Sequence, residues 1–100
     1  MEIIKKLSEK IDDELLDAEK YIKCAYRIEE EDKQLADTYY QLSLEEMRHV
    51  TMLHEQAERI ITEYKQTHTA PEGMQMLYDY LHERQIKWAA KIKTKQEEFK

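Results

Sequence analysis

Turn-forming and cross-linking residues are nearly absent from this sequence, which holds one glycine, one proline and one cysteine among 100 residues. A fold of many short strands needs turn residues that this chain does not have. The single cysteine, Cys24, cannot form a disulfide within the chain, which fits a reducing compartment. No apolar run has the length of a membrane span, and residues 1–10 do not resemble a signal peptide. The sequence therefore predicts a cytoplasmic protein with no membrane partner.

Charged residues are abundant, at 38% of the chain, and they leave a formal net charge of −6. Together with many Glu, Lys, Gln and Leu residues, this composition is typical of long helices. The net negative charge argues against nucleic acid as a partner. A chain of this length is one domain at most and buries a modest core, so self-association is an expected way to bury more surface.

Two interruptions divide the expected helices. Residues 66–73 read QTHTAPEG, where Pro71 and the spacing of a capping box mark a helix start. The acidic run at residues 29–33 coincides with a change in the phase of the hydrophobic pattern. We therefore expect a single all-α domain made of a helical hairpin over residues 1–65, a linker over residues 66–73 and a C-terminal helix over residues 74–100.

Each helix of the hairpin carries a stripe of apolar residues with a 4-3 spacing, and such stripes face a partner helix. Glu14 is the acidic member of the first stripe, and Glu46 and His49 interrupt the second. If the chain folds back near residue 30, Glu14 and Glu46 lie equally far from the turn. His49 is then about one turn away, because three residues rise about 4.5 Å. The stripes comprise Ile4, Leu7, Ile11, Glu14, Ala18, Tyr21, Ala25 and Ile28, and Leu35, Tyr39, Leu42, Glu46, His49, Leu53, Gln56 and Ile60.

This convergence of polar residues suggests a metal. A buried carboxylate is costly unless it is paired or bound to a cation, and neither stripe contains Lys or Arg. Carboxylate oxygens with imidazole suit iron, manganese or zinc. One hairpin supplies two Glu and one His. A two-fold dimer would supply four Glu and two His, which is the ligand set of a di-iron four-helix bundle.

The same residues resemble the first half of the ferritin-like superfamily, which includes rubrerythrins, bacterioferritins and encapsulated ferritins. There a metal-binding Glu is followed seven residues later by a Tyr, and a long helix carries the motif E-x-x-H. Glu14, Tyr21, Glu46 and His49 match this pattern, and the resemblance covers about residues 7–60. It implies a four-helix bundle with a di-iron site that oxidises Fe(II) with O₂ or peroxide.

The sequence departs from that superfamily in one respect. Full-length members repeat the half motif within one chain, whereas this sequence contains it once. Encapsulated ferritins build the site from two short chains, so they are the closest comparison. An encapsulating shell is a conceivable partner, but the last residues, KTKQEEFK, do not resemble a targeting tail.

Glu14, Glu46 and His49 are therefore the predicted metal ligands and catalytic residues of a ferroxidase-like oxidoreductase. Iron is the favoured cofactor, with manganese or zinc as alternatives. Tyr21 and Tyr39 can hydrogen-bond ligating carboxylates, although plain packing explains them almost as well. The competing interpretation is a non-enzymatic helical assembly or adaptor protein, whose Glu and His side chains bond only one another.

Other candidate ligands have weaker support from the pattern. Glu19 also precedes a Tyr by seven residues, but it lies outside the stripe, so we expect it to face solvent. His54 flanks the second stripe and could support the ligands, although a surface position is favoured. Asp79, His82 and Glu83 could donate ligands from the third helix. They deviate, however, from its better core face, which we expect to comprise Leu77, Leu81, Trp88 and Ile92.

Overall fold

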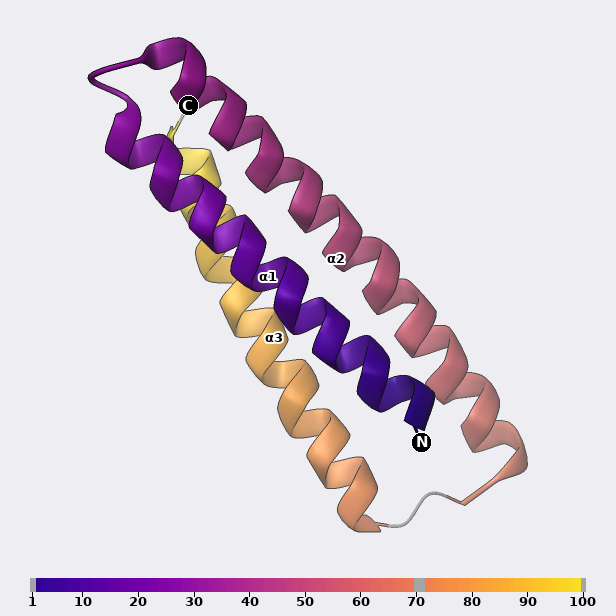
Figure 1. The fold of residues 1–100 in the computed structure, drawn as a ribbon. Coiled ribbons are helices and arrows are strands. Elements are labelled where there is room, and N and C mark those ends of the chain that lie inside the picture. Colours follow the sequence, from indigo (N-terminus) through magenta and orange to yellow (C-terminus); the bar gives the residue numbers. More distant parts are fainter. Residues whose placement is uncertain (1, 70–71, 100) are drawn as a thin grey trace.

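The computed structural model describes residues 2–69 and 72–99. These residues form three helices and no strand: α1 (Glu2–Ile28), α2 (Lys33–Thr67) and α3 (Glu72–Phe99). The helices make an elongated bundle of 55 × 18 × 18 Å, in which α1 and α2 are antiparallel and α3 follows the direction of α1 (Figure 1). The all-α class that the sequence predicts is confirmed, with α3 lying against the hairpin of the same chain.

The turn between α1 and α2 is compact and built from local hydrogen bonds. The backbone N–H groups of Glu31 and Asp32 donate to the Ile28 carbonyl at 3.0 and 2.9 Å. The Asp32 carboxylate then accepts from the backbone N–H of Leu35 at 3.0 Å, so that it caps the free N–H groups at the start of α2. The predicted interruption at residues 29–33 is therefore confirmed.

The second break follows α2. The backbone N–H of His68 donates to the Tyr64 carbonyl at 2.9 Å, and the rings of these two residues stack with centroids 4.4 Å apart. Residues 70 and 71, at the centre of the predicted linker, lie outside the described residues, and so does the predicted role of Pro71 at the helix start.

The buried residues of α2 each lie one position later in the sequence than a residue of the predicted stripe. Leu35 is 39% exposed, whereas the adjacent Ala36 is fully buried. The predicted stripe assumed a single partner helix, but α2 contacts both α1 and α3. The best-buried positions therefore turn toward the axis shared by three helices, and Glu46 and His49 lie beside this stripe. The buried residues of α2 are Ala36, Tyr40, Ser43, Met47 and Val50.

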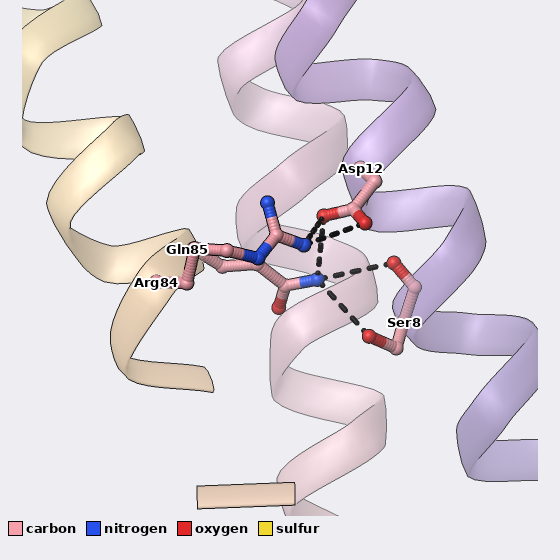
Figure 2. Close-up of polar contacts among 4 residues, drawn as sticks. All are labelled: Ser8, Asp12, Arg84 and Gln85. Carbon is pink, nitrogen blue, oxygen red and sulfur yellow. Dashed lines mark hydrogen bonds and ion pairs between the residues drawn. The ribbon is translucent and has the colours of Figure 1, made fainter. Parts of the chain in front are cut away.

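Polar side chains dock the middle of α3 onto α1 (Figure 2). One terminal nitrogen of Arg84 donates to both carboxylate oxygens of Asp12 at 2.7 Å. The side-chain amide of the buried Gln85 donates to the backbone carbonyl and the hydroxyl of Ser8, each at 3.1 Å, and to Asp12 at 3.0 Å. These contacts fix the height of α3 along α1.

Ser43 joins all three helices in the core. Its fully buried hydroxyl donates to the Ala18 carbonyl of α1 at 2.7 Å and accepts from the Gln96 amide of α3 at 2.8 Å. A buried hydroxyl that is paired on both sides avoids the desolvation cost of an unmade hydrogen bond. The α1–α2 register and the position of α3 are thus tied to one side chain.

Candidate metal centre

The structure brings together the three ligands that the sequence predicts. Glu14 projects from α1, and Glu46 and His49 project from α2. His49 Nδ1 lies 3.8 Å from Glu14 Oε2 and 3.6 Å from Glu46 Oε2. Two ligand atoms that each lie about 2.1 Å from one ion can be up to about 4.2 Å apart. Both separations therefore allow the three side chains to share one cation.

The two carboxyl groups are electrostatically coupled. A hydrogen bond with Glu14, burial and the negative charge of Glu14 together raise the pKa of Glu46 to about 7. The same hydrogen bond lowers the pKa of Glu14, with help from Lys10 and His49 and against the effect of burial. The pair therefore keeps one proton to a higher pH than two separate carboxylates would, as is expected for adjacent acidic groups.

Glu46 has an unpaired oxygen when the pair is ionised. Its Oε2 atom is buried, and no donor from the described residues reaches it. A buried acceptor without a donor carries a desolvation penalty that a bound cation would remove. The donor set and this unpaired oxygen both fit a divalent ion.

One basic side chain reaches the centre from outside the predicted stripe. Lys10 lies one turn before Glu14, and its Nζ is 3.5 Å from Glu14 Oε1. The Lys10 side chain is 58% exposed, so water screens this pair and its stabilising effect is small. Lys10 lies outside the predicted stripes and was therefore not among the predicted site residues, although a Lys four residues before a Glu is a sequence signal for an ion pair on a helix.

The cluster lies at an edge of the three-helix bundle. The side chains of Glu14 and Glu46 are 13% and 19% exposed, whereas that of His49 is 43% exposed. A centre open on the His49 side can receive further ligands from another molecule. Within one chain it supplies two carboxylates and one imidazole.

The remaining predicted site residues take different positions. Tyr21 and Tyr39 pack against each other, with ring centroids 6.2 Å apart, two turns along α1 from Glu14. This pairing agrees with the register in which residues equally far from the turn face one another. His54 lies instead beside Glu58 of α2 and His82 of α3, in a second group of potential ligands.

Glu19 is separate from the cluster, but it does not simply face solvent as expected. Its carboxylate accepts a hydrogen bond from the Trp88 indole N–H at 3.2 Å and pairs with Lys23 at 3.7 Å. The helical pattern correctly placed Glu14, and not Glu19, on the side of α1 that faces Glu46. It could not predict the contact between Glu19 and Trp88, because the pattern of α1 and α2 contains no information about α3.

Comparison of the chain with known protein families, with curated proteins and with solved structures finds no match. Within the described part of the chain, no helix carries an apolar stretch sufficient to cross a membrane. The function must therefore be inferred from the chain's own residues.

Proposed function

We propose that two copies of this chain pair through the open edge of the Glu14–Glu46–His49 cluster. Their hairpins would form a ferritin-like four-helix bundle around two metal ions. With iron bound, the protein would act as a ferroxidase-like oxidoreductase that oxidises Fe(II) with O₂ or peroxide. The family comparison rests on the spacing of Glu14, Tyr21, Glu46 and His49.

The observation that carries the proposal is the unpaired Oε2 of Glu46, which is buried beside a second carboxylate and an imidazole. Since no donor from the described residues reaches this oxygen, a purely structural cluster of Glu and His could satisfy it only by keeping a proton on the carboxyl pair. A cation satisfies it directly and also removes the repulsion that raises the pKa of Glu46. Oxygen and imidazole ligands are the set that suits iron, manganese or zinc.

The side chains have distinct roles in this proposal. Glu14 and Glu46 would hold the ions, and cation binding would displace the proton that the pair shares near neutral pH. His49 would add a nitrogen ligand on the side that faces the second copy. Bound iron would supply the electrons for reduction of the oxidant.

A non-enzymatic helical assembly protein is the second candidate. It is favoured by apolar side chains on α3 that remain exposed in the single chain, since exposed apolar surface is often a contact surface. Such a protein would associate without metal and would not oxidise Fe(II). The largest exposed members on α3 are Met76, Leu77, Tyr80 and Ile86.

An anaerobic iron-loading and oxidation assay separates the two candidates. We expect Glu14→Gln to lose iron oxidation and the iron bound at this centre, because the amide cannot replace the carboxylate as an anionic ligand. Glu19→Gln is the matched control, since its amide oxygen can still accept from Trp88. Equal iron oxidation by both variants would exclude the proposed centre.

A further inference from the structure

A second group of potential ligands lies away from the proposed centre, between α2 and α3. His54 and Glu58 are one turn apart on α2, and His82 comes from α3. His54 Nε2 lies 2.8 Å from His82 Nδ1 and 3.9 Å from Glu58 Oε1. The 2.8 Å contact is a hydrogen bond between the two rings, and the rings would need to separate by about 0.6 Å to become neighbouring ligands of one tetrahedral ion. The two imidazole rings are stacked, with centroids 4.4 Å apart.

These side chains face a cavity of about 420 Å³. His54 is 29% exposed and Glu58 is 62% exposed, so the group is open to solvent on the Glu58 side. Asp79 lines the same cavity, and its carboxylate accepts from the Gln75 amide at 2.8 Å. The cavity therefore has room for an ion and for a water molecule beside it.

The types of these side chains suit a metal. His54 Nε2 and His82 Nδ1 form a hydrogen bond at 2.8 Å, so one ring donates to the other, and a bound cation would replace the proton between them. Neutral imidazole nitrogen is a common ligand of metal ions in proteins. Two imidazoles and one carboxylate form a set of three protein ligands typical of Zn²⁺, in which the fourth position holds water.

We propose that His54, Glu58 and His82 bind one zinc-like divalent cation within a single chain, linking α2 to α3. The site is independent of the proposed ferroxidase-like function, because it uses none of the same ligands and requires no second copy. Its chemistry also differs, since it has two imidazoles and one carboxylate where the first centre has one imidazole and two carboxylates. Nitrogen-rich ligation favours zinc over the harder ions that carboxylates prefer.

The position of the site gives it a structural consequence. Met76 and Leu77, near the start of α3, are 67% and 54% exposed, so apolar burial holds this part of α3 weakly. The Ser43–Gln96 hydrogen bond joins α2 to α3 near the other end of the bundle. A cation at His82 would therefore anchor the half of α3 whose apolar side chains are the most exposed.

Zinc titration provides the test, in a Glu14→Gln/Glu46→Gln/His49→Ala background that removes the first centre. We expect this background to bind one Zn²⁺ per chain and to show a higher Tm when zinc is present. Adding His82→Ala should lower the affinity at least about tenfold, as loss of a metal-supporting group commonly does, and abolish the Tm shift. His68→Ala is the matched control, because His68 lies outside both ligand groups and should leave both properties unchanged.

Two further measurements, of the affinity on dilution and of Co²⁺ absorption, complete the test. The affinity should not change when the chain is diluted, and bound Co²⁺ should lose its visible absorption in the His82→Ala variant. If the background variant does not fold, the otherwise unaltered chain carrying His82→Ala should bind one Zn²⁺ fewer per chain than the unaltered protein. Unchanged zinc binding after His82→Ala, or binding that requires two chains, would overturn the intrachain site.

Discussion

At the scale of single residues, the surroundings of Glu46 differ most from those of an ordinary surface carboxylate. The sequence predicted its neighbours, because helical phase and distance from the turn placed it opposite Glu14. Its unpaired oxygen and the role of Lys10 depend on side-chain positions that a stripe pattern does not describe. The sequence therefore predicted that these side chains lie close together, whereas their hydrogen bonds and pKa shifts could be found only in the structure. That they bind a metal stays a prediction.

The raised pKa of Glu46 gives a pH prediction for metal-free protein. Folding favours the protonated carboxyl, so this stabilisation is complete below the unfolded pKa of 4.5 and is lost as the pH rises to about 7. The pKa of Glu14 is lowered instead, so the contribution of Glu14 to the free energy of unfolding changes only at pH values below about 4.5. One pKa unit equals about 1.36 kcal/mol, and solvent at the open edge screens part of the effect.

When the pH is raised from 5 to 8, we therefore expect the free energy of unfolding of Glu46→Gln to rise by about 1 kcal/mol relative to that of the unaltered protein. The amide stays neutral across this range, so the repulsion with Glu14 does not develop. Urea unfolding with a chelator at both pH values measures the difference. If the two proteins show the same pH dependence, Glu46 is already ionised at pH 5 and the shared proton is absent.

Ser43 gives a second prediction at this scale. Ser43→Ala removes the acceptor of the buried Gln96 amide, and an unsatisfied buried donor costs about 1–3 kcal/mol. The double variant Ser43→Ala/Gln96→Leu should recover part of this loss, because it removes both polar partners. Urea unfolding of the three proteins measures the effect, and a double variant no more stable than Ser43→Ala would contradict it.

At the scale of helices, the sequence predicted the α1–α2 register better than the position of α3. Tyr21 packs on Tyr39 because both helices present regular stripes on either side of one turn. In α3, Ile92 and Trp88 do join the core, but Leu77 is exposed and Gln85 and Gln96 are buried. Buried glutamines have no signal in a hydrophobic pattern, since their burial depends on partners from other helices.

The polar docking of α3 leads to a prediction that contrasts two neighbouring residues. The side chains of Arg84 and Asp12 are each about one-third exposed, so water screens their ion pair. Arg84→Ala should therefore lower the free energy of unfolding by no more than about 1 kcal/mol. Gln85→Ala should lower the free energy of unfolding by more, about 1–3 kcal/mol, because the half-buried acceptors of Ser8 lose this donor and Asp12 keeps only Arg84.

Unfolding midpoints and hydrogen exchange along α3 measure this contrast. Exchange should increase most around residues 81–89 in Gln85→Ala. Lys87→Gln is the matched control on the same stretch of helix, because it removes only an exposed ion pair with Glu83 and should leave exchange unchanged. An equal or larger cost for Arg84→Ala would show that the ion pair, rather than the buried amide, holds α3.

At the scale of the whole molecule, each chain contains half of the ligand set that the proposed function requires. Its three ligands lie at an open edge, and His49 is the most exposed of them. The turn and the helices are explained by local sequence, whereas assembly depends on surfaces that meet only between copies. The pairing of two hairpins into a four-helix bundle therefore stays a prediction.

The most direct test of the central claim is native mass spectrometry of the His82→Ala variant loaded anaerobically with Fe²⁺. This variant removes a ligand of the second site and leaves Glu14, Glu46 and His49 intact. The proposed function predicts a dimer that carries two iron ions, and it predicts that the added change His49→Ala removes both ions. A monomer that retains iron, or a dimer with no iron, would contradict the account.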